Sequence, residues 1–460
     1  MASNTHAISL NPATGEQIGA YAFESAADLE TVLSQSAKAY TSWRRTPVDA
    51  RSAALARLGQ ALRADIDRLA GMITAEMGKP ITQARGEITK CAGLCDWYAE
   101  HGPAMLASEP TQIENDKARI EYRPLGPILA VMPWNFPIWQ VIRSVVPALL
   151  AGNTYILKHA PNVMGSAYLL REAFGRADFP QGVFEVVNVQ NDLVSQAIAD
   201  DRIAAITLTG SVRAGSAIGS QAGFALKKCV LELGGSDAFI VLADADLDEA
   251  IRAAVVGRFQ NTGQVCAAAK RFIVEDSVAD AFTEGVVAGT KALVIGDPTD
   301  PSTYIGPMAR YDLRDELDAQ VQRTLSEGAK LLVGGKKIDG PGNYYQPTVL
   351  ADIVPGMTSF REEIFGPVAS IIRASDARNA LELANNSQFG LTASVFTKDL
   401  AAAQQIAADL EVGGVFINGY SASDVRVGFG GVKKSGFGRE LSHFGVREFC
   451  NAQTVWFDRK

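Results

Sequence analysis

The sequence of 460 residues is poor in cysteine and histidine and has no excess of positive charge. Its five cysteines and four histidines are too few and too scattered to indicate a disulfide framework or a metal site. Cys91 and Cys95 lie one turn apart on a predicted helix, and without a second pair nearby we interpret them as packing residues. The net charge of −8 argues against a basic face, so we expect no nucleic-acid partner.

Long apolar runs and a leader segment are also missing. No stretch reaches the roughly 18 uninterrupted apolar residues that a membrane helix needs, and prolines interrupt the most apolar region, residues 126–152. The first residues, MASNTHAISLNPATG, lack a basic segment followed by an apolar one, which is the pattern of a signal peptide. We therefore expect a soluble, cytoplasmic protein with no membrane partner.

What the chain does contain is the material for large cores. Apolar residues make up 47% of it, and its length suggests two or three domains, because domains run to roughly 100–200 residues each. Apolar spacing predicts helices over residues 26–100, whereas residues 105–122 favour a protruding hairpin. From residue 126, short apolar strands alternate with helices, which predicts an α/β fold with parallel sheets. A second α/β unit is expected to start near residue 235, and residues 449–458 are expected to form a final strand.

Cys266 lies in the stretch QNTGQVCAAAKRF, where small residues surround the thiol. A free cysteine is often a small buried apolar group, so the residue alone does not decide between packing and catalysis. Gly263 and the alanines after the thiol leave backbone N–H groups approachable, and a thiolate that attacks a carbonyl carbon needs such donors. Cys266 is therefore a candidate nucleophile, with core packing as the alternative.

Three further stretches place polar groups where α/β proteins bind ligands. Asn135 stands between two prolines in PWNFP after a strand, so its rigid amide could donate to an oxyanion; a structural turn is the alternative. Burial of Glu232 between two leucines would raise its pKa and make it a general base, whereas a strand end facing solvent would not. The turn at 209–211 joins a strand to a helix and suits an anion, although its glycine spacing fits neither a Rossmann fingerprint nor a P-loop.

Taken together, these motifs resemble the NAD(P)-dependent aldehyde dehydrogenase superfamily, and most closely its succinate-semialdehyde dehydrogenase group. The resemblance covers nearly the whole chain, with the motifs in the family's order. They are PWNFP (133–137), the strand ending at Lys158, TGS (209–211), ELGG (232–235), GQVC (263–266), EEIFGP (362–367) and FGGVKKSGFGRE (429–440).

The resemblance implies a subunit of three parts. A Rossmann-type dinucleotide-binding domain would span residues 1–104 and 123–234, and an α/β catalytic domain would span residues 235–440. A small β part that joins subunits would combine residues 105–122 with residues 441–460, and members of the family form dimers or tetramers.

The resemblance also assigns catalytic roles. Cys266 would attack the aldehyde carbon, while the amide of Asn135 and the backbone N–H of Cys266 would hold the oxyanion of the thiohemiacetal. Hydride transfer to the nicotinamide would then leave a thioester. Glu232 would activate the water that hydrolyses this thioester.

A cofactor site follows from the same resemblance. Lys158 would bind the adenosine ribose, Glu363 would bind the nicotinamide ribose, and Phe365 would pack beside the nicotinamide. The pyrophosphate would lie against Trp134 and the turn formed by Thr209, Gly210 and Ser211.

The choice between the two cofactors depends on the residues after the lysine strand. Pro161 stands where NAD-specific relatives carry a glutamate that repels a 2′-phosphate. No carboxylate repels a phosphate here, and we expect Lys158 and His159 to add positive potential. We therefore expect the enzyme to accept NADP, with use of NAD also possible.

A charged residue within a predicted apolar helix indicates which kind of aldehyde is the substrate. Arg143 lies within IWQVIRSVV, where an arginine is costly unless it has a partner. By resemblance, it would grip the distal carboxylate of succinic semialdehyde; the alternative is an internal pair with an acidic residue. Some members of the group have a second arginine where this chain has Gln260, which could hydrogen-bond a carboxylate but adds no charge. Ser423 and Arg426 are further candidates.

Three alternatives stay open at this point. One is an aldehyde dehydrogenase that acts on an uncharged or other small aldehyde. Another is an inactive binding or structural protein that keeps the fold, although every expected catalytic residue is present. The third is a thiol redox sensor, which a resolving cysteine near Cys266 would favour and which the sequence does not supply.

Overall fold

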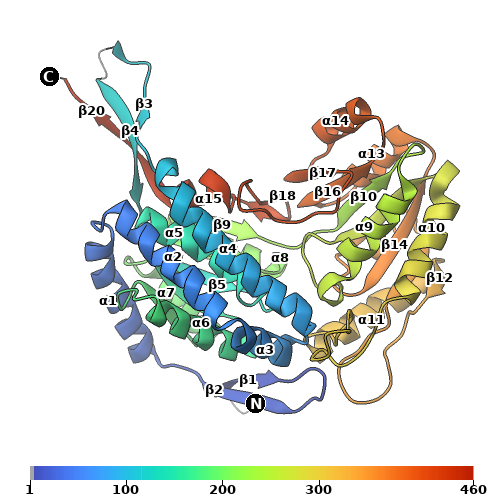
Figure 1. Cartoon of the computed structure of the whole chain (residues 1–460), viewed down its shortest axis with the longest axis horizontal. Helices are drawn as coiled ribbons and strands as arrows, with labels where there is room; N and C mark the ends of the chain where they lie inside the picture. Colours follow the sequence, from blue (N-terminus) through green and yellow to red (C-terminus); the bar gives the residue numbers. More distant parts are fainter. Residues whose placement is uncertain (1–4, 115–116, 459–460) are drawn as a thin grey trace.

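The computed structural model describes residues 5–114 and 117–458. It confirms the α/β class, because helices pack around two separate and mostly parallel sheets (Figure 1). The chain coloured blue to green forms the first unit, and the yellow and orange chain forms most of the second (Figure 1). No helix in the described part of the chain is long and apolar enough to cross a membrane.

The first sheet has six strands in the order β19-β9-β8-β5-β6-β7, and only β19 runs antiparallel to its neighbour. Alternate residues of the central strand PILAVM enter different cores: Ile128 and Ala130 join one cluster, and Leu129 joins another. Both faces are therefore covered, as expected for parallel strands without polar alternation. The strands are β5 (Pro127–Met132), β6 (Thr154–His159), β7 (Phe184–Val187), β8 (Ala205–Thr209), β9 (Lys228–Glu232) and β19 (Gly436–Phe437).

Helices form as predicted before this sheet and between its strands. Ser25 and Asp28 form a capping box at the first of them, and α5 is buried on every side because nearly all of its residues are apolar. The helices of this unit are α1 (Ala26–Trp43), α2 (Val48–Ala64), α3 (Ile66–Met77), α4 (Ile81–Met105), α5 (Trp139–Ala151), α6 (Met164–Arg176), α7 (Asn191–Ala199), α8 (Val212–Phe224) and α15 (Ser442–Glu448).

The second sheet has seven strands in the order β12-β13-β14-β11-β10-β16-β17, with only the β12–β13 pair antiparallel. Its strands are β10 (Asp237–Val241), β11 (Ala269–Glu275), β12 (Lys330–Val333), β13 (Thr348–Ala351), β14 (Val368–Ala374), β16 (Thr392–Phe396) and β17 (Gly414–Ile417). Its helices are α9 (Leu247–Phe259), α10 (Asp276–Lys291), α11 (Tyr311–Ser326), α12 (Thr358–Arg361), α13 (Ala377–Asn385) and α14 (Leu400–Asp409).

The predicted hairpin and the predicted final strand meet in one small sheet. Strand β4 (Ala118–Pro124) lies between β3 (Glu109–Pro110) and β20 (Cys450–Trp456), antiparallel to both. This sheet projects from the first unit at the upper left of Figure 1. Two further antiparallel pairs are β1 (His6–Leu10) with β2 (Gln17–Ala22) and β15 (Phe389–Gly390) with β18 (Val432–Lys433).

The chain connects the two large sheets more than once, and these connections place the site. It leaves the first sheet after Glu232 and begins the second at Asp237. It later returns, and Gly436 of β19 pairs with Glu232 of β9. The expected catalytic part, residues 235–440, thus contributes a strand to the first sheet, and the division into three functional parts stays a prediction.

Candidate active site

A cavity of about 660 Å³ lies where the loops after the first sheet meet the second unit. Its size falls in the range of small-molecule sites, and the carboxyl ends of parallel strands are where α/β proteins bind ligands. Many of the residues predicted from the motifs line this cavity. These are Trp134, Asn135, Thr209, Gly210, Ser211, Cys266, Glu363 and Phe365.

The loop that carries Cys266 is held by buried cations. Lys270 donates to the carbonyl groups of Val265 and Cys266, and Arg258 donates to the carbonyl of Gly263 at 2.5 Å. Gly263 has a φ of +70°, and a Cβ there would meet the carbonyl oxygen of Gly366 at 2.3 Å. Close packing therefore explains this glycine, rather than the exposure of N–H groups that the sequence suggested.

Cys266 is half-buried and lines the cavity, so core packing alone does not explain it. Burial raises its pKa to about 11, while the positive charges of Arg143 and Lys270 act in the opposite direction. The resting thiol is thus mainly protonated at neutral pH. Attack on a substrate requires removal of that proton.

Asn135 lines the same cavity as this thiol, on the loop between β5 and α5. Its side-chain nitrogen donates to the carbonyl of Gln264 at 3.1 Å, and its own carbonyl accepts from the side chain of Asn261 at 2.8 Å. Within the described residues the Asn135 amide donates no other hydrogen bond, so one hydrogen is free for a ligand oxygen. The structure therefore favours an oxyanion donor over a purely structural turn.

Glu232 ends β9 and is only 2% exposed, so the solvent-facing alternative is wrong. Burial raises the pKa of its carboxyl group well above the usual value, and the charge of Arg143 partly offsets this effect. One carboxyl oxygen lies 3.9 Å from a guanidinium nitrogen of Arg143, and the other oxygen has no hydrogen-bond partner in the described chain. Such a carboxyl group can accept a proton near neutral pH.

Arg143 is buried close to the catalytic candidates, and its charge acts on both Cys266 and Glu232. It is 2% exposed, and its Nε lies 2.5 Å from the carboxylate of Glu440. Its side chain also stacks over Phe429, with 5.1 Å to the ring centroid. Burial of an arginine calls for an acidic partner, and Glu440 supplies one, as the alternative expected; the contact of Arg143 with the substrate carboxylate stays a prediction.

The turn after β8 has the form of an anion site. Ser211 is the N-cap of α8, and its hydroxyl accepts from the backbone N–H of Ala214 at 3.2 Å. The first turn of α8 therefore lies beside the cavity with its positive dipole end. The glycine spacing has a packing cause instead, since a Cβ at Gly215 would lie 2.5 Å from the side chain of Leu233.

On the opposite wall, Glu363 is held in place from two sides. It accepts from the backbone N–H of Gly235 at 3.0 Å and lies 3.7 Å from the ammonium of Lys270. A Cβ at Gly234 would lie 2.1 Å from the Glu363 carboxylate, so any side chain at that position would push the carboxylate aside. Phe365 meets Trp134 edge-to-face at 5.8 Å, and both rings line the cavity.

Two of the expected cofactor residues lie outside the lining of this cavity. Lys158 is the half-buried penultimate residue of β6, and Pro161 lines a neighbouring cavity of about 440 Å³ beside the β1–β2 hairpin. His159 is buried and bonds the carbonyl of Pro137 at 2.8 Å. Because burial lowers the pKa of His159 to about 4, it is neutral, and the expected positive potential from this residue is wrong.

The three other substrate candidates are separated from the cavity lining. Gln260 begins the short turn after α9, and Arg426 pairs with Asp424 at 2.7 Å on the surface. Ser423 accepts a hydrogen bond from Lys90 at 2.8 Å. The structure thus brings the catalytic candidates together but does not bring these three to the Cys266 cavity.

Sequence reasoning missed several polar residues that line the cavity, including Gln140 and Arg213, and it missed the partner of Arg143. Gln140 lines the cavity, is 1% exposed, and leaves its side-chain oxygen without a hydrogen-bond partner in the described chain. Glu440, in the motif GFGRE, is the partner of Arg143. Gln140 could have been noticed because it is a polar residue in a mostly apolar helix. Nothing in the sequence near Glu440 indicates that it packs against α5.

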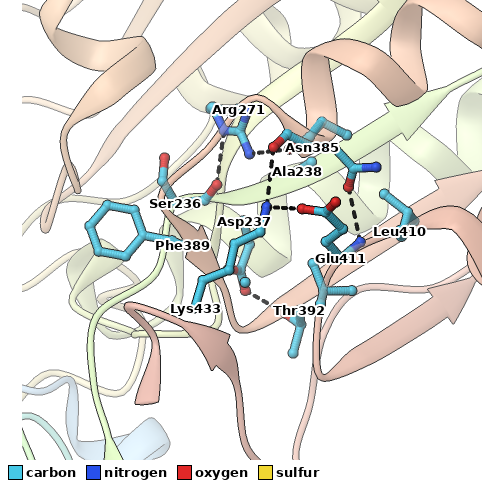
Figure 2. A pocket seen from close by; sticks show the side chains of 13 residues that line it. Ser236, Asp237, Ala238, Arg271, Asn385, Phe389, Thr392, Leu410, Glu411 and Lys433 are labelled. Atoms are coloured by element: carbon cyan, nitrogen blue, oxygen red, sulfur yellow. Dashed lines mark hydrogen bonds and ion pairs between the residues drawn. The ribbon is translucent and has the colours of Figure 1, made fainter. Parts of the chain in front are cut away.

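Figure 2 shows a much smaller cavity at the start of the second sheet, with room of about 10 Å³ for one water molecule. Arg271 donates to the carbonyl of Ser236 at 2.9 Å, and the hydroxyl of Thr392 donates to the Asp237 carboxylate. These groups satisfy one another. The basic residue Arg271, close after Cys266 in the sequence, therefore holds the fold together rather than contacting a ligand.

A thiol and an amide donor in one cavity, with a buried carboxyl group that acts electrostatically on the thiol, suit acyl transfer through a covalent thioester. Comparisons with known proteins agree with this chemistry. Residues 1–455 match the model of the aldehyde dehydrogenase family.

Full-length relatives carry the same name. Succinate semialdehyde dehydrogenase [NAD(P)+] Sad from Escherichia coli (strain K12) is 65% identical over 455 residues, which cover 99% of this chain and 98% of the relative. A succinate-semialdehyde dehydrogenase [NADP(+)] from Mycolicibacterium paratuberculosis is 47% identical, covering 97% of this chain and 96% of the relative. The structure of succinic semialdehyde dehydrogenase from Streptococcus pyogenes with NADP+ superimposes with a TM-score of 0.96 at 37% identity, over 98% of this chain and 99% of that one. The chain therefore belongs to the aldehyde dehydrogenase family.

Proposed function

We propose that this protein oxidises succinic semialdehyde, or a similar small carboxylated aldehyde, to the acid with NADP+ or NAD+. The observation that carries the chemistry is that Cys266 and Asn135 line one cavity, while the buried carboxyl group of Glu232 lies close enough to act electrostatically on the Cys266 thiol. The carboxylated substrate is supported by the names of full-length relatives at 65% and 47% identity.

The first step is addition of sulfur to the aldehyde carbon. The Cys266 thiolate forms the carbon–sulfur bond, and the carbonyl electrons move to oxygen. The free amide hydrogen of Asn135 and the backbone N–H of Cys266 hold this oxyanion. Arg143 and Lys270 favour the thiolate through their positive charges.

Several features of the cavity suit a nicotinamide dinucleotide. The helix N-terminus at Ser211 suits a pyrophosphate, and the carboxylate of Glu363 suits a ribose hydroxyl. The rings of Trp134 and Phe365 give an apolar wall. NAD(P)+ in this cavity supplies the hydride acceptor that turns the thiohemiacetal into a thioester.

Hydrolysis of the thioester returns the enzyme to its starting state. Glu232 takes a proton from water, the resulting hydroxide adds to the thioester carbon, and the Cys266 thiolate leaves. The raised pKa of Glu232 makes its carboxylate a stronger base than a solvent-exposed one. Arg143, paired with Glu440, positions this carboxyl group from behind.

The cofactor preference follows from Lys158 and Pro161, not from His159. No carboxylate occupies position 161, so nothing there repels a 2′-phosphate, and Lys158 adds one positive charge. We propose that NADP+ is accepted, with NAD+ as a second cofactor. Strict use of NAD+ in a comparison of kcat/KM values would contradict this assignment.

We also propose a homodimer or homotetramer in the cytoplasm. Strand β20 is an exposed edge of the small sheet, which leaves its hydrogen-bonding groups available to a second copy. All five cysteines are free, as is usual in a reducing compartment.

The test of the substrate compares succinic semialdehyde with butanal, which has the same number of carbons and no carboxylate. We expect a kcat/KM at least tenfold higher for succinic semialdehyde, measured as cofactor reduction. Equal values for the two aldehydes would favour the alternative, an aldehyde dehydrogenase for an uncharged substrate.

A further inference from the structure

One buried ion pair has no part in the proposed chemistry. Lys79 lies between α3 and α4, Glu87 lies on α4, and both side chains are 1% exposed. Burial lowers the pKa of Lys79, and the charge of Glu87 acts in the opposite direction. Two charges buried in this way need further hydrogen bonds to offset the loss of water. The other carboxylate oxygen of Glu87 makes these bonds at the active-site loop.

Glu87 caps the helix that follows Asn135. Its other carboxylate oxygen accepts from the backbone N–H groups of Ile138 and Trp139, at 2.9 Å each. These groups open α5 and have no partner inside the helix, and the apolar side chain of the N-cap residue, Ile138, cannot cap them. The helix dipole favours a carboxylate at this end. Glu87 therefore fixes the backbone shortly after Asn135.

Lys79 contacts the same loop through an aromatic ring. Its ammonium lies 3.7 Å from the ring centroid of Phe136, the residue after Asn135. A cation over the face of a ring is attracted to it, and more strongly where water is excluded. The buried pair thus holds the loop both at Phe136 and at the start of α5.

Gln83, one turn before Glu87 on α4, holds the loop that leads to the nucleophile. Its side-chain oxygen accepts from the backbone N–H of Asn261 at 2.7 Å, and its nitrogen donates to the carbonyl of Tyr304 at 3.0 Å. Asn261 has a φ of +53°, a conformation that a residue other than glycine keeps only when surrounding contacts hold it. Gln83 supplies one such contact shortly before Cys266.

The two loops also contact each other. The side-chain nitrogen of Asn261 donates to the backbone carbonyl of Asn135 at 2.8 Å, and the side-chain nitrogen of Asn135 donates to the backbone carbonyl of Gln264 at 3.1 Å. Residues one turn apart lie on the same side of a helix, so Gln83 and Glu87 present one face of α4 to both loops. The position of the Asn135 amide relative to the nucleophile therefore depends on this face.

We propose that Gln83 and Glu87 are positioning residues: they hold the loops of Asn135 and Cys266 at the separation in which the Asn135 amide stabilises the oxyanion. This inference rests on the proposed function, which gives Asn135 that role. Neither Gln83 nor Glu87 lines the Cys266 cavity, so both act through the loops. A displacement of about 1 Å in such a site can cost on the order of 100-fold in rate. Lys79 serves the arrangement by neutralising Glu87.

The readout that separates positioning from general structural support is a double-mutant cycle with Asn135→Ala. If Gln83 and Glu87 act through the Asn135 amide, their replacement costs little once that amide is gone. A general loss of correctly folded enzyme would instead lower kcat by the same factor in both backgrounds. The cycle is measured in the full-length enzyme as kcat for cofactor reduction with succinic semialdehyde.

Gln83→Met removes both polar contacts of Gln83 and no charge. We expect it to lower kcat about tenfold with little change in KM for the aldehyde, because the Asn135 amide acts mainly in the transition state. In the Asn135→Ala background it should lower kcat by less than about twofold. Gln35→Met, at a half-buried glutamine of α1, is the matched control and should keep the wild-type kcat.

Glu87 is tested together with Lys79→Met, which leaves no charge of the pair buried without a partner. Glu87→Gln in this background keeps a side-chain oxygen for the N–H groups of α5, whereas Glu87→Leu removes it. We expect the glutamine variant to keep kcat within about threefold of the wild type and the leucine variant to lose about tenfold. Because the two variants have equal charge, their difference reports the cap itself.

The outcomes separate this inference from the proposed function. If the wild type reduces no cofactor with succinic semialdehyde, or if Asn135→Ala keeps the wild-type kcat, the proposed chemistry fails and the inference fails with it. If both behave as proposed but Gln83→Met keeps the wild-type kcat, or loses the same factor with and without Asn135, only the positioning role is overturned. Melting temperatures identify a variant that fails to fold, and the variants of the other positioning residue then decide.

Discussion

At the scale of single residues, the site depends on charges that are buried with their partners. Cys266, Glu232 and Arg143 form one electrostatic group, in which burial suppresses ionisation of the thiol and the carboxyl group while the guanidinium favours it. The sequence predicted the first two from their motifs. For Arg143, the sequence allowed either a substrate contact or an internal ion pair, because only the folded chain brings Glu440 close to α5.

The thiol of Cys266 should react with iodoacetamide in proportion to its thiolate fraction. With a pKa of about 11 in the cofactor-free enzyme, that fraction grows with pH, and we expect the alkylation rate to rise about tenfold per pH unit from pH 7 to pH 10. Cys266→Ser gives the background from the other thiols. A rate that levels off below pH 9 would mean that the thiolate is already formed in the resting enzyme.

Replacement of Arg143 by methionine should destabilise the protein, not merely change its substrate preference. It leaves Glu440 and Glu232 buried without a counter-charge, and loss of one partner of a buried pair costs about 3–5 kcal/mol. We expect a lower melting temperature and a similar loss of kcat/KM for succinic semialdehyde and butanal. Unchanged stability with a loss confined to the carboxylated aldehyde would instead support Arg143 as the substrate contact.

At the scale of secondary-structure elements, the pattern of strands and helices predicted the layers, and the loops between them required the structure. Strands such as PILAVM are apolar enough to be placed from sequence alone. The cavity, in contrast, is built from loops whose shape comes from contacts between distant segments, such as Glu363 against Gly235. Lys158 and Pro161 also could not be placed from the sequence. Their motif belongs to the same predicted cofactor site as the residues around Cys266, yet neither residue lines the Cys266 cavity, and Pro161 lines the neighbouring one.

A substitution at Gly234 tests whether these loops position Glu363 for the cofactor. Gly234→Ala would place a methyl group 2.1 Å from the present position of the Glu363 carboxylate, which must then move off the N–H of Gly235. We expect KM for the cofactor to rise at least fivefold with little change in melting temperature. Gly175→Ala in α6, where a Cβ meets no atom within 4 Å, is the matched control. An unchanged KM for the cofactor would show that Glu363 does not contact it.

At the scale of the whole molecule, the two large sheets and the small projecting sheet have distinct tasks in our account. The first two form the cavity between them, and the third presents the edge of β20. Composition and alternation predicted the α/β class because both faces of each sheet are apolar. How copies of the chain assemble depends on surface geometry, which alternation does not encode.

Removal of residues 451–460 tests the proposed assembly. It deletes most of β20, and we expect sedimentation to report a smaller particle than for the complete chain. Because β20 contacts α15 and β4 rather than the cavity residues, the truncated subunit should keep its α/β circular dichroism. A truncated protein that sediments as the same oligomer would place the subunit interface elsewhere.

The most direct test of the central claim is rapid mixing of the enzyme with succinic semialdehyde and NADP+, followed by absorbance of the reduced nicotinamide. The account predicts steady reduction by the wild type, none by Cys266→Ala, and for Glu232→Gln a single burst of about one equivalent per active site before turnover stalls as the thioester accumulates. Sustained reduction by Cys266→Ala would contradict the account.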